Sequence, residues 1–151
     1  MQRASAALVT SVCMEKNRMD KISFILDETD QLLLLHEWET VFLLEKRDNS
    51  VLWKEKYVGD PTCGLIDKDN KWAVVAGDHL TIWSQGKALN VAGLADIHSI
   101  RLEKADTLKV LIDPWSTRSA VWKVNVKTLE KSKIRDFSEY RDKPYTEEVK
   151  W

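Results

Sequence analysis

Glycine, cysteine and long apolar runs are all scarce in this chain of 151 residues. The five glycines form neither a G-x-G-x-x-G pattern nor a phosphate-binding loop, so nucleotide binding has no support. The two cysteines, Cys13 and Cys63, are too few for a small disulfide-stapled secreted domain, which favours a reducing compartment. No apolar run reaches about 18 residues, so we expect no transmembrane helix.

The N-terminus lacks the features of a secretory signal peptide. Thr10 and Ser11 interrupt its apolar residues early, and no apolar core of about 7–15 residues forms. We therefore expect a cytoplasmic protein. The strand-like pattern is weak before Lys21 and strong after it. This divides the chain into an N-terminal extension over residues 1–19, helical or disordered, and a single β domain over residues 20–151.

Recognisable catalytic and metal-binding motifs are also missing. The histidines have no metal-ligand spacing, and there is no G-x-S-x-G nucleophile motif. The D-K-D-N turn at 67–70 resembles the start of a calcium loop, but the loop glycine and the closing glutamate are missing. Because neighbours in a strand point to opposite faces, we do not expect the adjacent Asp78 and His79 to act together. The sequence predicts a non-enzymatic protein with no metal and no cofactor.

What the chain has in quantity is strand-forming sequence. Three segments, at 22–35, 63–75 and 100–112, resemble one another, and each places a strand before an acidic turn and another strand after it. Each segment continues into a further hairpin, and turn residues recur about every 8–12 positions. This pattern predicts an all-β chain of antiparallel meanders, with about three four-strand units.

The arrangement of these meanders stays open at the level of sequence. A repeat of about 40 residues with four short strands is typical of a propeller blade. Closed propellers need about four blades or more, so three meanders would close only as a dimer or an unusually small ring. In a monomer the same strands can fold into a sandwich or an open barrel. The sequence therefore leaves open whether the meanders are blade-like or fold over as a sandwich or open barrel. It also leaves open whether the protein is a monomer or a dimer.

Individual strands carry further information. The apolar run at 32–35 is typical of a strand that is covered on both faces, whereas residues 121–127 alternate between apolar and polar, which predicts one solvated face. After Phe137 the sequence becomes mostly charged. We expect this segment to be either a tail packed along the domain through its aromatic residues, Tyr140, Tyr145 and Trp151, or a short final strand.

The net charge is −1, which favours neither nucleic acid nor an anionic membrane as a partner. The charge is unevenly spread, however, because residues 20–60 hold ten Asp and Glu against five Lys and Arg. This acidic block is either a solvated face or a docking surface for a basic partner.

Seven tryptophans are many for this length. Four lie in predicted strands, where we expect core or sheet-face positions: Trp53, Trp72, Trp83 and Trp122. Trp38 and Trp115 lie in predicted turns instead. Trp115, close to Arg118 in the string D-P-W-S-T-R, either packs against the domain or anchors an interface.

The segment Y-V-G-D-P-T-C-G-L-I-D-K-D-N-K-W-A-V-V-A-G, with the later strings D-P-W-S and I-R-D-F, resembles immunity proteins of bacterial polymorphic-toxin and contact-dependent growth inhibition systems. The similar portion covers about residues 57–137. The resemblance implies a small cytoplasmic protein that binds and neutralises a cognate toxin C-terminal domain, often a nuclease with a basic cleft. The candidate toxin contacts are Asp27, Glu28, Asp30, Glu37, Trp38, Glu39, Trp115 and Arg118.

Two other classes of function remain alternatives to an immunity protein. One is a scaffold β-domain that mediates protein–protein contacts through open sheet edges. The other is a carbohydrate-binding or small hydrolase domain that uses the loop tryptophans.

Overall fold

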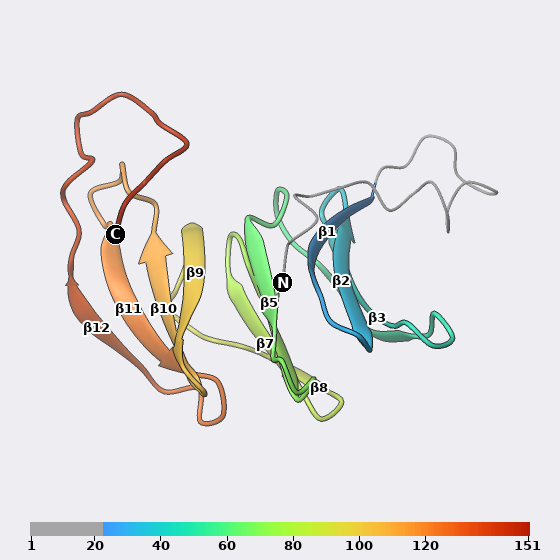
Figure 1. Ribbon diagram of the computed structural model, residues 1–151. Helices are drawn as coiled ribbons and strands as arrows, with labels where there is room; N and C mark the ends of the chain where they lie inside the picture. Colours follow the sequence, from blue (N-terminus) through green and yellow to red (C-terminus); the bar gives the residue numbers. More distant parts are fainter. Residues whose placement is uncertain (1–22) are drawn as a thin grey trace.

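The computed structural model describes residues 23–151, and every regular element in this range is a β-strand. Twelve strands form three four-stranded antiparallel sheets, each made of four consecutive strands (Figure 1). The prediction of an all-β chain with three four-strand meanders is therefore confirmed. None of residues 23–151 belongs to a helix that could cross a membrane. The predicted extension over residues 1–19 lies outside the described residues.

The three sheets are numbered in chain order. Sheet 1 contains β1 (Ser23–Glu28), β2 (Leu32–Glu37), β3 (Thr40–Glu45) and β4 (Val51–Lys56). Sheet 2 contains β5 (Cys63–Ile66), β6 (Trp72–Ala76), β7 (Leu80–Ser84) and β8 (Lys87–Asn90). Sheet 3 contains β9 (Ile97–Lys104), β10 (Thr107–Ile112), β11 (Ala120–Asn125) and β12 (Lys131–Asp136).

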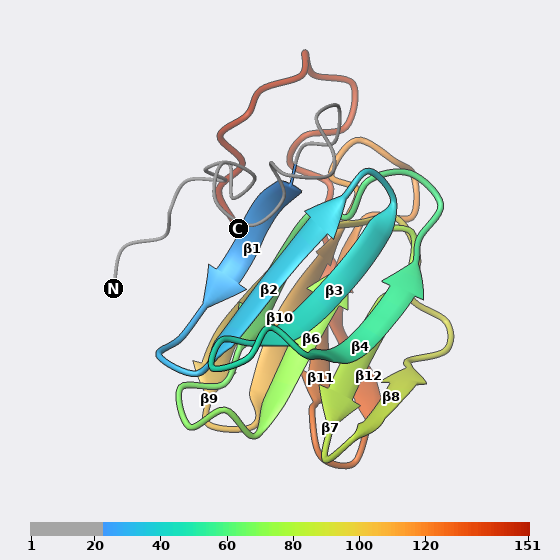
Figure 2. The same cartoon turned by 90° about the vertical axis from the view of Figure 1, so that its right-hand side faces the viewer.

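The sheets stack in chain order like successive blades, as Figures 1 and 2 show. The first strands meet, since β1 contacts β5 and β5 contacts β9, whereas β4, β8 and β12 are the outer strands. Within the described residues each strand pairs only inside its own sheet. Two hydrophobic layers result: the first layer lies between sheets 1 and 2, and the second layer lies between sheets 2 and 3.

Strand β6 shows why the middle sheet has the most apolar sequence. Trp72 and Val74 belong to the second layer, whereas Ala73 and Val75 belong to the first layer. All five residues of β6 are buried because both faces of sheet 2 are covered. A strand in that position requires a continuous apolar run rather than an alternating one.

The predicted alternation at 121–127 is confirmed in sheet 3. Val124 and Val126 are 0% and 3% exposed, whereas Lys123 and Lys127 are exposed. In the run at 32–35, Leu34 joins the first layer, and Leu35, which points to the other face, is also buried.

The close fit between sheets 1 and 2 depends on Gly64 in β5. A Cβ atom at this position would lie 2.8 Å from Leu34 Cδ2 and 3.1 Å from Leu26 Cβ. Any side chain larger than hydrogen would therefore push β5 away from sheet 1.

The chain beyond β12 packs on the outer face of sheet 3 and adds no strand. Phe137 is buried there with Tyr140, Val149 and Trp151 nearby, and the Arg101 guanidinium lies 4.1 Å from the Trp151 ring centroid. Of the two expectations for this segment, the packed tail is the observed one, although the Tyr145 side chain is largely exposed.

Candidate functional site

Several connecting loops gather at one end of the three sheets, here called the loop end. It comprises the β2–β3, β4–β5, β6–β7, β8–β9 and β10–β11 connections. Backbone hydrogen bonds link these loops: Ile97 N donates to Gly77 O at 2.8 Å between sheets 3 and 2, and Asp113 N donates to Asp96 O at 2.9 Å, which extends the β9–β10 pairing. Loops held on a rigid sheet scaffold are a common location of binding residues.

Trp38 occupies an unusual position at the loop end. It is the first residue of the two-residue β2–β3 turn, with φ of 56°, and its side chain is 63% exposed. His36 Nδ1 lies 2.9 Å from Trp38 O, which can only accept, so the imidazole donates this hydrogen bond and holds the turn. Turns of this kind favour Gly or Asn because a positive φ strains bulky residues. Strain at an exposed aromatic residue is typical of a functional position.

Val58 provides a second exposed apolar group beside this turn. It is 79% exposed, and its loop is joined to the Trp38 turn because Tyr57 N donates to Glu39 O at 2.7 Å and Gly59 N donates to Glu39 Oε2 at 2.8 Å. The Glu39 side chain therefore fixes the loop that presents Val58.

Carboxylates lie at the same end of the sheets as this apolar pair. Asp60 and Asp96 are exposed, and Glu39, Asp78 and Asp113 are half-buried at the same end. The cations at this end are Lys56 and Arg118, which are exposed, and Arg141, which is half-buried and donates to Ser116 O and Thr117 O. The loop end therefore combines an apolar centre at Trp38 and Val58 with an excess of negative charge.

Beneath this surface, His79 lies between two carboxylates from different sheets. His79 Nε2 is 2.5 Å from Glu55 Oε2 of sheet 1, and His79 Nδ1 is 3.1 Å from Asp78 Oδ2. Tyr57 stacks on the imidazole with ring centroids 3.9 Å apart. Thr81 donates to the same Glu55 oxygen at 3.0 Å.

The premise that Asp78 and His79 point to opposite faces is wrong, because the two side chains contact each other. They lie in the turn before β7 rather than within a strand, so the alternation of strand faces does not apply. Burial lowers the pKa of His79, but hydrogen bonds to Glu55 and Asp78 outweigh it and raise this pKa above 6.5. For Asp78, burial raises the pKa, but hydrogen bonds from His79 and the Val58 N–H outweigh that effect and lower it.

This cluster links sheets 1 and 2 through His79, and it is called the clamp below. The two carboxylates contact opposite nitrogens of one ring, so they do not converge on a common point, and residues 23–151 contain no group of three or more potential ligands arranged for a metal ion. Burial raises the pKa of the Cys63 thiol to about 11, which keeps it protonated and a poor nucleophile near neutral pH.

The predicted contacts in the acidic block separate into buried and exposed groups. Asp27 is 6% exposed, and its Oδ2 accepts a hydrogen bond from Ile66 N at 2.8 Å, so it joins β1 to β5. Glu37 is 7% exposed and accepts from the Ser23 hydroxyl. Glu28 forms an ion pair with Lys46 at the end opposite the loop end, where Asp30 is exposed. Asp27 and Glu37 thus add no exposed charge.

Trp115 and Arg118 lie in the β10–β11 loop, over sheet 3. The Trp115 ring contacts His98, Tyr140 and Tyr145, with centroids 5.0 Å apart for the pair with Tyr145. Of the two alternatives for Trp115, the structure therefore has it packed against its own chain. Arg118 is exposed beside it.

Sequence reasoning placed Trp38 and Glu39 among the candidate residues but missed Val58, Asp60 and Asp96. Trp38 and Glu39 were candidates because they lie in the acidic block over residues 20–60. Val58 carried no signal, since an isolated valine before a glycine is typical of a strand end.

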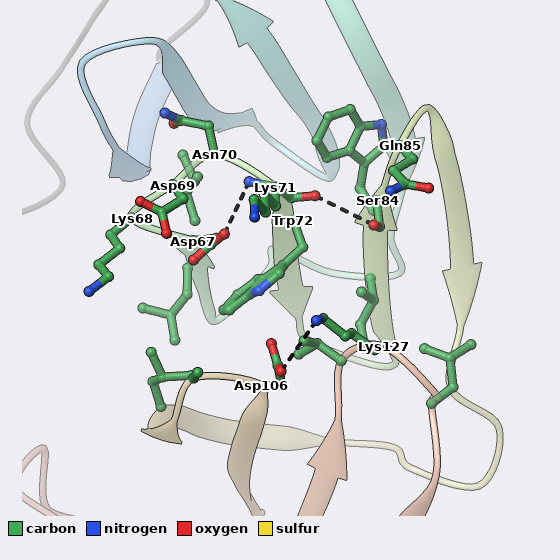
Figure 3. Close-up of a pocket in the computed structure, with 18 of the residues that line it drawn as sticks. Asp67, Lys68, Asp69, Asn70, Lys71, Trp72, Ser84, Gln85, Asp106 and Lys127 are labelled. Carbon is green, nitrogen blue, oxygen red and sulfur yellow. Dashed lines mark hydrogen bonds and ion pairs between the residues drawn. The ribbon is translucent and has the colours of Figure 1, made fainter.

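A groove opens at the opposite end of sheets 2 and 3, with a volume of about 1780 Å³ (Figure 3). The Trp72 ring extends into it from sheet 2, and the ion pair between Asp106 and Lys127, at 3.6 Å, borders it on sheet 3. The predicted turn at 67–70 forms part of its edge, and Asn70 adopts φ of 62° there.

Comparisons with known proteins support the fold only. No protein-family model and no curated protein matches the chain. Among solved structures, the chain is similar to Kuenenia stuttgartiensis hydrazine synthase, with a TM-score of 0.55 and 12% sequence identity. The match covers 72% of this chain and 34% of that one, so this chain spans about a third of its length. At such low identity the likeness carries no information on activity.

Proposed function

We propose that this protein is a binding module whose loop end occupies a basic cleft on a partner protein, and that the partner is a toxin domain, as in the immunity proteins that the sequence resembles. The carrying observation is Trp38, which is 63% exposed although its positive φ strains it. Burying an exposed aromatic side chain in a partner contributes more binding free energy than most interface contacts, and this gain offsets the backbone strain at Trp38.

The charge at the loop end supports a basic partner. Asp60 and Asp96 are exposed, and Glu39 lies directly beside the apolar pair Trp38 and Val58. Carboxylates around an apolar centre resemble the polar rim and hydrophobic core of protein interfaces. A toxin nuclease with a cationic cleft would be steered towards this surface and then held by the apolar pair.

Trp38→Gly tests the proposal because folding and binding should respond in opposite directions. Glycine accepts a positive φ, so the free energy of unfolding should stay the same or rise by up to about 1–2 kcal/mol. Affinity for the toxin domain encoded next to this chain should fall about tenfold or more, measured by calorimetry with the full chain.

Val51→Gly serves as the matched control, since Val51 is 52% exposed on β4 but away from the loop end, and it should leave affinity unchanged. Reversing Asp60 to Lys should slow association most at low salt. If the neighbouring toxin domain does not bind, or if Trp38→Gly binds as well as the parent protein, the proposal fails.

A further inference from the structure

The groove between sheets 2 and 3 has apolar walls that the second layer does not fill. Leu89 of β8 and Leu102 of β9 line opposite walls and are 50% and 47% exposed. Deeper residues of the same walls are buried, with Ile82 at 2% and Val126 at 3%. Single exposed leucines are ordinary on a protein surface, but two on opposite walls of one groove extend the apolar layer out to solvent.

Some charged side chains around the groove have partners in the protein and others do not. Asp106 pairs with Lys127, and Asp67 Oδ2 accepts a hydrogen bond from Lys71 N at 3.1 Å. Lys68, Lys71 and Lys87 are exposed and form no salt bridge with any described residue. Asp69 is exposed on the same rim, and neither Asp67 nor Asp69 forms a salt bridge with a described residue. Lys68, Lys71 and Lys87 therefore leave a small excess of positive charge there, which suits an acidic ligand.

Strand β8 borders the groove and is an outer strand with a free edge. It contains one charged residue, Lys87, whereas β4 and β12 carry three or more charges each. Charged side chains, lysine above all, are how proteins protect an edge from pairing with other chains. All four residues of β8 are exposed, and β7 is its one partner strand among the described residues. An extended peptide can add to such an edge through its backbone.

We infer that this groove binds an extended segment of a partner protein in which aliphatic side chains are flanked by acidic ones, and that the segment pairs with β8. Alternate side chains of an added strand lie beside Leu89 on the face of sheet 2 that faces sheet 3. The acidic residues at one end of the segment lie nearest Lys87, and Lys68 and Lys71, in the β5–β6 turn, add positive charge at the same end of the groove. This surface lies at the end opposite the loop end, so it does not depend on the function proposed above.

Binding to the full chain is tested with a labelled, end-blocked peptide, Asp-Asp-Leu-Ser-Leu-Ser-Leu-Asp-Asp. Its first comparison peptide replaces every Asp with Lys, and its second keeps the side chains but carries N-methylated backbone amides at all three leucines and both serines. Fluorescence anisotropy should give an affinity for the acidic peptide about tenfold or more above that of either comparison peptide. Backbone amide shifts in NMR should be concentrated at residues 87–90.

Leu102→Asp should weaken binding of the acidic peptide about tenfold or more, because it places a charge on the apolar wall. Its control is Ile134→Asp, a residue of similar exposure on β12 that does not line the groove, and this variant should bind like the parent protein. Equal affinity for the acidic and basic peptides, unchanged binding by Leu102→Asp, or no binding of the acidic peptide would each overturn the proposal. Equal binding of the N-methylated peptide would overturn the pairing with β8.

Discussion

The first and second layers of this protein are joined in different ways. Polar contacts close the first layer at both ends: the Asp27 carboxylate accepts from Ile66 N at 2.8 Å at one end, and Glu55 contacts His79 at 2.5 Å at the other. The second layer is a larger apolar cluster, with the Thr62 hydroxyl donating to Ile97 O near the loop end. Its opposite end opens into the groove.

The difference teaches what each kind of contact contributes. Hydrogen bonds and ion pairs depend on distance and angle, so they determine how sheets 1 and 2 are aligned at both ends. Apolar burial is non-directional, so it holds sheets 2 and 3 together without dictating where their separation widens. The aligned first layer supports the loop end, and the second layer leaves space for a ligand.

The largest change in the free energy of unfolding is expected from removing buried apolar side chains, because both layers depend on apolar burial. Leu108 in the second layer and Leu34 in the first are both fully buried. Each change to Ala should lower the free energy of unfolding by about 2–5 kcal/mol, because it leaves a cavity. Urea denaturation of both variants checks this, with the half-exposed Leu102→Ala as a control expected to change it by about 1 kcal/mol or less. A clear loss in one layer alone would mean that the layers differ in packing as well.

A smaller effect is expected from the polar contacts of the first layer. Asp27→Ala removes the acceptor of the buried Ile66 N–H and should cost about 1–3 kcal/mol. Asp30→Ala, at an exposed position in the next turn, should change stability by about 0.5 kcal/mol or less. Equal unfolding midpoints for these two variants would show that the link between β1 and β5 does not stabilise the first layer.

Two of the three histidines, His79 and His98, should give opposite pH dependences of stability. Since the folded-state pKa of His79 is raised above 6.5, its stabilisation is fully present below that pH and is lost as pH rises through the folded pKa. Burial lowers the pKa of His98, although Asp113 opposes the effect, so His98 contributes stability that is fully present above pH 6.5 and is lost as pH falls from 6.5 through its lower folded-state pKa.

Denaturation curves between about pH 5 and 9 for His79→Gln and His98→Gln check this reasoning. Relative to the parent protein, His79→Gln should be most destabilising at low pH, and His98→Gln should be most destabilising at high pH. The same trend in both variants would contradict the clamp that joins sheets 1 and 2.

The smallest effect is expected at the edge of the groove. The ion pair between Lys127 and Asp106 is 3.6 Å long, and the Lys127 side chain is 71% exposed. Lys127→Ala should therefore change the free energy of unfolding by about 0.5 kcal/mol or less, and less still at high salt. A loss above about 1 kcal/mol would mean that this contact closes the second layer as polar contacts close the first.

Much of the fold could be predicted from local pattern. The alternation around Val124 and the continuous apolar run of β6 specify which faces of sheets 3 and 2 are covered, since side chains in a strand point to alternate sides. The candidate site was harder to predict. Trp38 and Glu39 were found through composition, but the clamp of Glu55 and His79 joins residues 24 positions apart and has no local signal.

The amino-acid sequence by itself determined the strands, their turns and their grouping into three meanders, because periodicity and turn chemistry act between residues close in the chain. The tertiary structure alone decided that the meanders stack as blades and that Asp27 is buried while Trp38 is exposed. It also decided that Trp115 packs against the C-terminal segment and that a groove opens between sheets 2 and 3. These features depend on how whole sheets pack against one another. That packing is determined by many weak contacts between residues distant in sequence.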